Sequence, residues 1–191
     1  YHFAIGTAGS TVLVCQTILP VLALSNARSS VTFEGGTHNG KSPSLCFFEQ
    51  SYLPLMQLMG MRCEVERIAL GFYPAGGGKW KITIEPTKDL GEVALTTAAS
   101  NFAATPENCQ LHALISQLPL SIGEREVKTA TDILNWDAAE GTVTEVDSPG
   151  PGNSFQLKIK SNTHTSVFEV VGEMGVSAGR VAKRCAGRVR K

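Results

Sequence analysis

The sequence predicts an α/β (α+β) fold built in two parts. Short strand-like runs alternate with amphipathic helical runs along the 191 residues, a pattern typical of sheets covered by helices. Small and polar residues from Ala98 to Gln110 interrupt this alternation and indicate a linker or a domain crossing. Beyond them, a β-α-β-β-α pattern predicts a split βαβ module of about 90 residues.

The first predicted helix runs from about Ser10 to Ser25, after a strand end at Tyr1–Ile5. Ser10 is a suitable N-cap because its hydroxyl can accept a hydrogen bond from a free N–H of the first turn. Apolar residues cover most of the helix surface, so we expect burial on nearly all sides and a kink at Pro20. Gln16 is the polar exception, and its amide is either satisfied by neighbouring backbone or exposed through a gap.

The rest of the first half continues the alternation of strands and helices. A short strand is predicted at Ser30–Glu34 and an amphipathic helix at Ser44–Met59, weakened by Pro54 and ended by Gly60. Three further strands are predicted at Met61–Leu70, Lys79–Glu85 and Glu92–Thr97.

The second half predicts four strands and two helices. The first helix is expected to begin with a capping box formed by Ser121 and Glu124. The strands are predicted at Leu111–Ser116, Gly141–Val146, Ser154–Lys160 and Thr165–Val171, and the helices at Ser121–Leu134 and Ser177–Arg190.

Composition excludes several classes of protein. Lysine and arginine balance aspartate and glutamate at 17 each, so no global charge favours nucleic acid or membrane binding. Five cysteines without a C-x-x-C pair argue for reduced thiols in a cytoplasmic protein, and against a disulfide framework or zinc site. The longest apolar segment, Val12–Leu24, is too short to span a bilayer. Because the chain begins with Tyr1 rather than Met, we expect a piece of a longer polypeptide.

The octet Gly71-Phe72-Tyr73-Pro74-Ala75-Gly76-Gly77-Gly78 lies between two predicted strands. Three consecutive glycines indicate special backbone geometry or close approach by another chain or ligand. Phosphate-binding loops and dinucleotide fingerprints need a helix directly after the glycines, whereas a strand follows here. From the residues alone, the octet is either a flexible surface hairpin or a ligand loop.

Several motifs together resemble the RNA 3′-terminal phosphate cyclases, and the bacterial members most closely. They occur in the order and at the spacing typical of that family. The octet is the family signature, although Leu70 stands where His or Arg is usual before it. The other matching stretches are Tyr1–Ser10 running into Gln16–Pro20, Gly35–Asn39, Gly150–Asn153 and Val170–Glu173.

The resemblance implies a domain organisation. Residues 1–97 would form part of the large catalytic domain, which is built from repeated ββαβαβ-type units of two helices on a four-stranded sheet. Residues 98–191 would form a smaller thioredoxin-like domain inserted into it. Without a C-x-x-C pair, that fold carries no redox role.

The resemblance also implies an ATP-dependent ligase-type enzyme. Family members adenylylate a histidine, transfer AMP to the RNA 3′-phosphate and let the neighbouring 2′-hydroxyl attack, which produces a 2′,3′-cyclic phosphate, AMP and diphosphate. A divalent metal, Mg or Mn, would neutralise phosphate charge. The alternative is a non-catalytic scaffold in rRNA processing and ribosome assembly, as for cyclase-like relatives without activity, and Leu70 leaves this open. A weaker alternative is an isolated α/β module without ATP function.

Few of the implied site residues lie in this chain. Gln16 matches the family's nucleotide-contacting glutamine, Pro43 aligns with the proline that packs against adenine, and Phe47 lines up beside it. No catalytic residue is matched, because the nucleophilic histidine is expected beyond residue 191 and the metal-binding glutamate before Tyr1. The chain alone is therefore expected to be inactive.

Two further sets of residues fall outside this match. The histidines His2, His38, His112 and His164 are interpreted as surface or core residues. Cations crowd the last twelve positions, where they form either the solvated face of a helix whose inner stripe is Val181, Cys185 and Val189, or an RNA contact.

Overall fold

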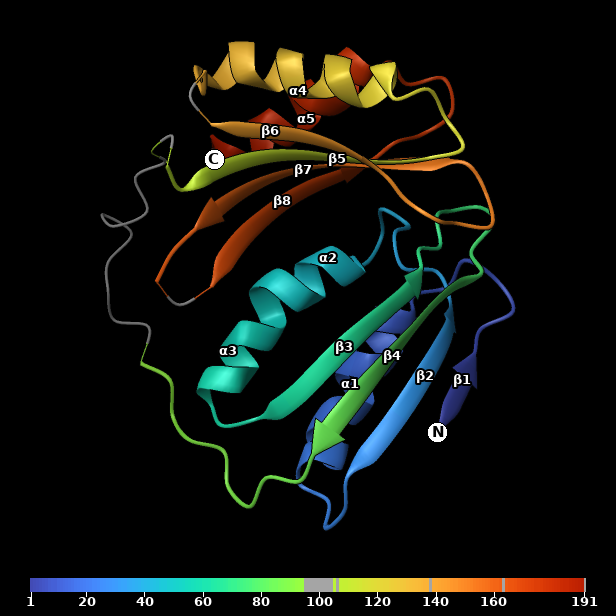
Figure 1. The fold of residues 1–191 in the computed structure, drawn as a ribbon, viewed down its shortest axis with the longest axis vertical. Coiled ribbons are helices and arrows are strands. Elements are labelled where there is room, and N and C mark those ends of the chain that lie inside the picture. Colours follow the sequence, from blue (N-terminus) through green and yellow to red (C-terminus); the bar gives the residue numbers. More distant parts are fainter. Residues whose placement is uncertain (95–104, 106, 138, 163, 191) are drawn as a thin grey trace. The chain divides into compact units, whose positions relative to one another are not determined.

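Two four-stranded sheets organise the chain, and each carries its own helices (Figure 1). The computed structural model describes residues 1–94, 105, 107–137, 139–162 and 164–190. One unit comprises Tyr1–Thr96 with Asp147–Gly150, and the other comprises Thr97–Val146 with Pro151–Lys191. Both sheets contain parallel and antiparallel pairs, so this is an α/β protein with two mixed sheets.

The first sheet has the strand order β1-β2-β4-β3. Its strands β1 and β2 are parallel and are joined through helix α1, whereas β2, β4 and β3 pair antiparallel. A second helical segment, formed by α2, η1 and α3, connects β2 to β3. The bounds are β1 His2–Ala4, α1 Thr11–Ala23, β2 Ser29–Gly35, α2 Leu45–Phe47, η1 Phe48–Tyr52, α3 Leu53–Leu58, β3 Arg62–Ala69 and β4 Gly78–Glu85.

Trp80 lies at the centre of the core of this unit. Alternation along β4 turns it to the same face as Phe33 of β2, with 4.5 Å between ring centroids. Its indole Nε1 donates to Thr11 Oγ1 of α1 at 2.9 Å, and its ring meets Phe48 of η1 edge-on at 5.9 Å. Both helical segments therefore cover the same face of the sheet.

The second helix differs from the single helix predicted at Ser44–Met59. Its middle part, Phe48–Tyr52, is a π-helix, in which the Leu53 N–H donates to the Phe48 carbonyl five residues earlier. Pro54 then lies at the start of α3, directly after this π-helical turn. The predicted end was correct, because Gly60 adopts φ +101° directly after the last turn.

The second sheet has the order β6-β5-β7-β8 and carries α4 and α5. Apolar residues of β5 and β7, such as Leu111, Phe155 and Leu157, pack with Val181 and Cys185 of α5 in its core. The four strands and two helices predicted one by one for this half are all present, so the pattern β-α-β-β-α was one strand short. The bounds are β5 Cys109–Ser116, α4 Ser121–Leu134, β6 Glu140–Glu145, β7 Gly152–Lys160, β8 Thr165–Val171 and α5 Ala178–Val189.

The predicted capping box at α4 is wrong. The N-cap is Leu120, no side chain caps the helix, and Ser121 already lies inside it. Leu120 has helical dihedral angles, φ −57° and ψ −26°, rather than the extended geometry that a capping serine needs. The carbonyls of Pro119 and Leu120 accept from the Ile122 and Glu124 N–H groups instead.

Two expectations concern the segment between the units. Residues Glu92–Ala94 of the predicted strand Glu92–Thr97 form no strand, and its remaining residues lie outside the described part of the chain. The linker predicted at Ala98–Gln110 also lies mostly outside it, while Cys109 and Gln110 already belong to β5. Within the described residues, no helix has both the length and the apolar character needed to cross a membrane.

Candidate functional site

The glycine-rich segments of the first unit meet at one end of its sheet. The loops after β1 and β2 leave at the carboxyl ends of these parallel strands, where α/β folds commonly place their binding sites. The octet between β3 and β4 lies against both loops, because Gly71 accepts from the Thr37 and His38 N–H groups at 2.9 and 3.0 Å. The loop Asp147–Gly150 joins them, since the Leu70 N–H donates to the Asp147 carbonyl at 2.8 Å.

Several hydrogen bonds hold this glycine-lined end together. Thr37 Oγ1 accepts from the Gly71 N–H at 3.0 Å, and the Gly36 N–H donates to the Gly9 carbonyl at 2.9 Å. Thr11, at the start of α1, donates from its hydroxyl to the Gly36 carbonyl at 2.8 Å. The octet is thus a hydrogen-bonded part of the unit and not a free hairpin.

The octet glycines allow backbone segments to approach one another closely. A Cβ on Gly71 would lie 2.3 Å from the Gly35 carbonyl oxygen, which no side chain could accommodate. Gly77 has φ +65°, and a Cβ there would lie 2.9 Å from Cγ of Pro149. The peptide bond between Tyr73 and Pro74 is cis.

Helix α1 is less buried than its composition predicted. Its buried residues are Thr11, Val12, Cys15, Leu19 and Ala23, all on the side that packs on the sheet. Leu13, Val21 and Leu24 are 46%, 70% and 51% exposed, so the expectation of burial on nearly all sides is wrong. Only one face of the helix has a covering layer among the described residues.

Gln16 lies on this exposed face of α1. Among the described residues its amide makes no hydrogen bond. Of the two alternatives from the sequence, an amide bonded to neighbouring backbone or an exposed amide, the structure shows the exposed one. An exposed amide without internal partners is available to a ligand. When no ligand is bound, water solvates it, so it costs no desolvation free energy.

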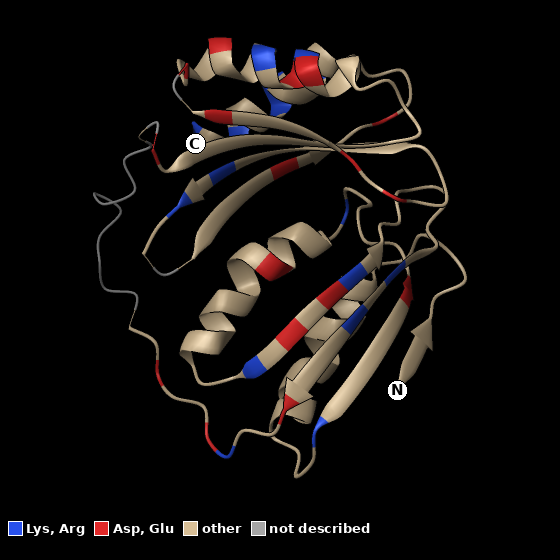
Figure 2. Ribbon diagram, viewed as in Figure 1, with Lys and Arg blue, Asp and Glu red and all other residues tan. Residues whose placement is uncertain are grey.

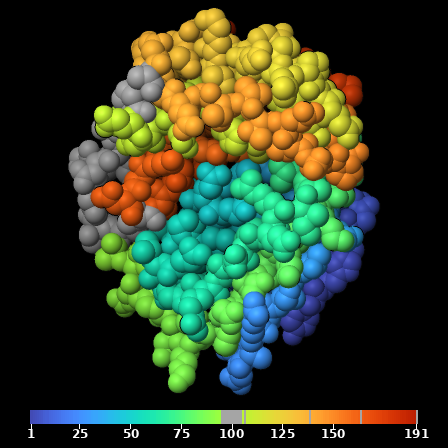
Figure 3. Space-filling view, viewed as in Figure 1, coloured from blue at the N-terminus to red at the C-terminus, as the bar shows by residue number. Residues whose placement is uncertain are grey.

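Pro43 and Phe47 lie where the loop after β2 enters α2. Pro43 is exposed, Ser44 caps α2 by accepting from the Phe47 N–H at 3.1 Å, and the Phe47 side chain is half-buried. Asn39 shapes the preceding loop, with its Oδ1 accepting from the N–H groups of Lys41 and Ser42 at 3.0 and 3.1 Å. Figure 3 shows in cyan the outer surface that the segment from α2 to α3 presents. Gln16, Pro43 and Phe47 therefore all have accessible surface, as contacts to a bound nucleotide require.

The histidines His38, His112 and His2 each contact neighbouring residues of the fold. His38 is fully buried, with its Nδ1 2.8 Å from Thr37 Oγ1 and its ring tilted against Phe72. His112 Nε2 lies 2.9 Å from Thr144 Oγ1, and its Nδ1 lies 3.1 Å from Lys158 Nζ. His2 is exposed and lies 3.4 Å from Glu34.

Four of the cysteines are poor nucleophiles. All five are free thiols. Burial raises the pKa of Cys109 to about 11 and that of Cys185 to about 12, and it also raises the pKa values of Cys15 and Cys63. Thiolates are therefore scarce near neutral pH. No group of three or more His, Cys, Asp or Glu residues suited to a metal occurs in the part of the chain that the structure describes.

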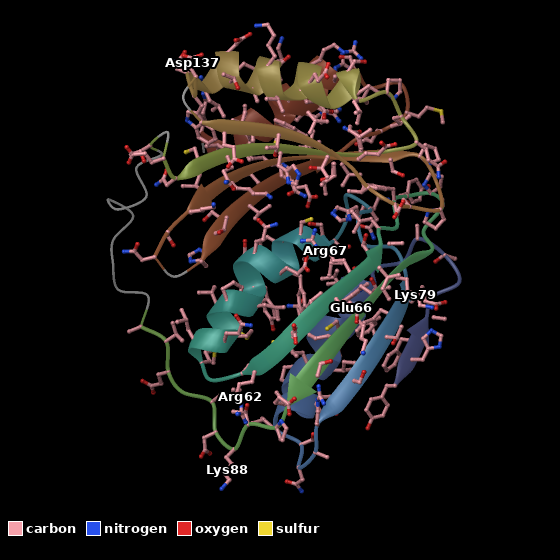
Figure 4. All side chains as sticks on the ribbon, in the orientation of Figure 1. Arg62, Glu66, Arg67, Lys79, Lys88 and Asp137 are labelled. Carbon is pink, nitrogen blue, oxygen red and sulfur yellow. The ribbon has the colours of Figure 1, made fainter. Side chains whose placement is uncertain are left out.

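Charged side chains on the sheet of the first unit are largely paired. On the face away from the helices, Lys79 lies 2.7 Å from Glu34 and Lys81 lies 3.9 Å from Glu66, so both signs interleave along β3 and β4 (Figure 2). The Lys79 hydrogen bond lowers the pKa of Glu34. On the helix side, Arg67 of β3 donates to Glu49 of η1 at 2.6 Å, and Figure 4 labels it between these elements.

A groove of about 410 Å³ lies elsewhere on this unit, between α3 and the ends of β3 and β4. Its guanidinium groups are occupied, because Arg28 pairs with Glu85 at 2.8 Å and Arg62 donates to the Pro86 carbonyl at 3.1 Å. Neither Gln16, Pro43 nor Phe47 lines it, so we do not place the candidate site there.

A match to a known protein family shows which family this chain belongs to. Residues 1–180 match the family model described as RNA 3′-terminal phosphate cyclase. The chain belongs to the RNA 3′-terminal phosphate cyclase family. The match takes in the glycine-lined end, α1, the α2–α3 segment and the second unit as far as the first turn of α5, so the resemblance predicted from the motifs is confirmed.

Curated cyclases are similar along almost the whole chain. The RNA 3′-terminal phosphate cyclase of Koribacter versatilis (strain Ellin345) is 39% identical over 188 residues, which are 97% of this chain and 51% of that protein. The cyclase of Salmonella typhimurium is 38% identical over 192 residues, or 100% of this chain and 55% of that protein. The Pseudomonas aeruginosa (strain UCBPP-PA14) cyclase is 36% identical over 187 residues. The chain thus spans about half the length of the curated relatives it matches.

Leu70, which departs from the family signature, is buried in the first unit. Its side chain is only 4% exposed, and its N–H is the donor to Asp147. An apolar residue therefore fits this position.

The resemblance was the signal that singled out Gln16, Pro43 and Phe47. Sequence reasoning missed another polar residue, Glu126, which is fully buried between the apolar positions of α4. A glutamate three residues after Gly123 and four before Ala130, both on the buried stripe of the helix, was the available signal.

Proposed function

We propose that the protein containing this chain is an ATP-dependent RNA 3′-terminal phosphate cyclase, which converts an RNA 3′-phosphate to a 2′,3′-cyclic phosphate. The observation that carries the proposal is the family match over residues 1–180 together with the intact, hydrogen-bonded octet. ATP would supply the activated adenylyl group, and a divalent metal (Mg or Mn) would balance phosphate charge. The chain on its own would lack the nucleophilic histidine expected beyond residue 191.

Gln16, Pro43 and Phe47 would hold the adenine end of the nucleotide. The exposed Gln16 amide can both donate to and accept from a base edge. Pro43 and the half-buried Phe47 offer apolar surface against which a base can pack. The Ser44 cap and the Asn39 hydrogen bonds would keep these two residues in place before the nucleotide binds.

The two units would correspond to two domains of the parent enzyme. Residues 1–97 would be one of the repeated units of the large domain, because they build two helical segments on one face of a four-stranded sheet. Residues 98–191 would be the inserted thioredoxin-like domain, with a β-α-β-β-β-α order and no paired cysteines among its described residues. Five free thiols fit a reducing cytoplasm.

The reaction is tested directly by incubating the full-length protein with ATP and an RNA that ends in a 3′-phosphate. We expect a 2′,3′-cyclic phosphate end and release of AMP. A protein that binds this RNA but forms no cyclic end, with ATP and metal present, would instead act as the non-catalytic scaffold.

The nucleotide contact is tested by the substitution Gln16→Ala in the full-length protein. Loss of hydrogen bonds to the base is expected to weaken ATP binding about tenfold, because a hydrogen bond of this kind contributes about 0.5–1.5 kcal/mol. Calorimetric titration measures the affinity, and Thr17→Ala, an exposed neighbour on the same helix, is the matched control. Unchanged ATP affinity in a folded Gln16→Ala protein would reject the assignment.

A further inference from the structure

A buried carboxyl group lies in the second unit, which contains none of the residues assigned to the nucleotide above. Glu126 is on α4, and its side chain has no exposed surface. Its Oε1 accepts from Asn153 Nδ2 at 2.6 Å, whereas its Oε2 is buried with no hydrogen-bond partner among the described residues. An unpartnered buried oxygen of this kind is costly when ionised, and proteins rarely retain one without a reason.

Asn153, the partner of Glu126, is fitted tightly at the start of β7. Its carbonyl accepts from the Gly172 N–H at 2.9 Å. A Cβ on Gly172 would lie 1.6 Å from Asn153 Oδ1, so the amide fills the space that a side chain would occupy. The Asn153 amide is thus held from one side by Glu126 and from the other by the backbone at Gly172.

The segment just before Asn153 leads to the glycine-lined end of the first unit. Asp147–Gly150 packs within that unit, where Pro149 meets Gly77, Gly150 meets Ala75, and Asp147 accepts from the Leu70 N–H. Only Pro151 and Gly152 separate these residues from Asn153. Asn153 is therefore joined to the loop beside the octet by a connection of two residues.

The surroundings of Glu126 favour its neutral form. Burial raises the pKa of the carboxyl to about 7, although the Asn153 hydrogen bond and the Arg125 charge on α4 lower it. From α5 the group facing it is the Cys185 thiol, whose own pKa is raised to about 12. The group of β7 that faces the Glu126 carboxyl is the neutral Asn153 amide. Among the described residues, no cation on the packed elements other than Arg125 acts on the Glu126 carboxyl.

We propose that Glu126 is a proton-dependent clamp: its neutral carboxyl stays enclosed beside Asn153 at the start of β7, and ionisation, which places charge on the buried Oε2 that has no donor, favours opening of β7 and of the Asp147–Gly152 connection. The sign follows from linkage. Because the folded protein binds this proton more tightly than the open form does, the clamp is closed at low pH and weakens as pH rises from about 4.5 to about 7, levelling off above. The proposal does not depend on the cyclase activity.

Hydrogen exchange of the full-length protein between pH 5 and 8.5 tests the clamp, with peptides that cover residues 147–160. In the unmodified protein we expect the opening constant, corrected for intrinsic exchange, to rise by up to about tenfold per pH unit below pH 7 and then level off. In Glu126→Gln, which cannot ionise, the opening constant should stay constant across this range. Glu124→Gln removes the same charge from the exposed side of α4 and should behave like the unmodified protein.

Two results would overturn the clamp. One is an identical pH dependence of opening in Glu126→Gln and the unmodified protein. The other comes from a measurement that needs no variant, a carbon-13 titration of the glutamate carboxyl groups in the unmodified protein. If no glutamate in residues 107–190 titrates above pH 6, Glu126 is not a switch in this range, even if the variant fails to fold.

Discussion

At the scale of single residues, the octet glycines matter because a Cβ at their positions would clash with neighbouring atoms. Gly77 combines a left-handed backbone, φ +65°, with a neighbour, Pro149, that leaves no room for a Cβ. Gly175 has a similar φ of +79° but open space around it. The two positions separate the cost of backbone strain from the cost of lost packing space.

We predict that Gly77→Val is more destabilising than Gly175→Val. A valine at either position must adopt a left-handed conformation, which lowers the free energy of unfolding by about 1–2 kcal/mol. At Gly77 the clash with Pro149 lowers it further, by about 1–3 kcal/mol. Urea unfolding of the two variants measures the difference. We also expect Gly77→Val to lower the proposed cyclase activity of the full-length protein, because the octet packs on the loops that lead to α1 and α2.

Full activity in a folded Gly77→Val protein would contradict the view that the octet supports the nucleotide-bearing part. Equal stability of the two variants would show that Pro149 moves aside freely. Gly175→Val is the control for backbone strain in both measurements.

Single residues were predictable where the neighbouring sequence determines their role. Ser10 was identified as the N-cap of α1, and its hydroxyl accepts from the Leu13 N–H at 3.2 Å. Gln16 was expected among buried apolar residues, but burial depends on which face of α1 receives a covering layer, and local sequence does not contain that information. Glu126 was missed although its spacing from Gly123 and Ala130 placed it on the buried stripe of α4, and the packing of α4 on its sheet shows that the carboxyl is fully enclosed.

At the scale of elements, two serines that look alike in the sequence differ in the structure. Ser10 has extended dihedral angles, φ −71° and ψ 109°, and caps α1. Ser121, predicted to cap α4, lies inside that helix, and the cap position Leu120 offers no side-chain hydrogen bond. The difference arises because Pro119 and Leu120 already turn the chain into helical geometry before Ser121.

We therefore predict that Ser10→Ala costs about 1 kcal/mol of stability, whereas Ser121→Ala costs almost nothing. Alanine at Ser121 removes no capping bond and has the higher helix propensity. Chemical denaturation of both variants under the same conditions measures the two free energies of unfolding. A loss at Ser121→Ala as large as that at Ser10→Ala would restore the capping box and contradict the helix start described here.

The π-helical turn at Phe48–Tyr52 shows a limit of prediction at the same scale. Pro54 was recognised as a disturbance of the helix, but the form that the disturbance takes depends on tertiary contacts. Phe48 packs against Trp80, and Glu49 binds Arg67 of β3. These contacts join residues far apart in the sequence, so hydrophobic periodicity could not reveal them.

At the scale of the whole molecule, the second unit was predicted better than the first. Its strands alternate regularly and its turns carry strong signals, such as Pro149, Gly150 and Pro151 between β6 and β7. The assignment of Asp147–Gly150 to the first unit was not predicted. It depends on the hydrogen bond from Leu70 and on contacts with Ala75 and Gly77, which bring together residues ~70 positions apart in the chain.

The charge distribution also concerns the whole molecule, because a balanced total hides the basic helix α5. Val181 and Cys185 of its inner stripe are buried, and Val189 packs partly buried against the same core, as predicted. Several outer cations are already engaged within the unit: Arg184 lies 3.5 Å from Glu173, Arg188 donates to the Glu169 carbonyl, and Arg190 donates to the Ile133 carbonyl. These interactions favour a solvated, self-paired face over an RNA contact.

We predict that Arg184→Gln with Arg188→Gln leaves the RNA affinity of the full-length protein and its salt dependence unchanged. If both side chains neutralised phosphates of single-stranded RNA, removing them would reduce the slope of log affinity against log salt by about 1.4. Titration of a labelled RNA at several salt concentrations measures the slope. Arg180→Gln with Lys183→Gln makes the same charge change with two exposed cations of the same helix, so a shift common to both double variants reports net charge alone. A reduced slope confined to the first pair would mean that Arg184 and Arg188 leave their partners to bind RNA, and α5 would then be part of the RNA-binding surface.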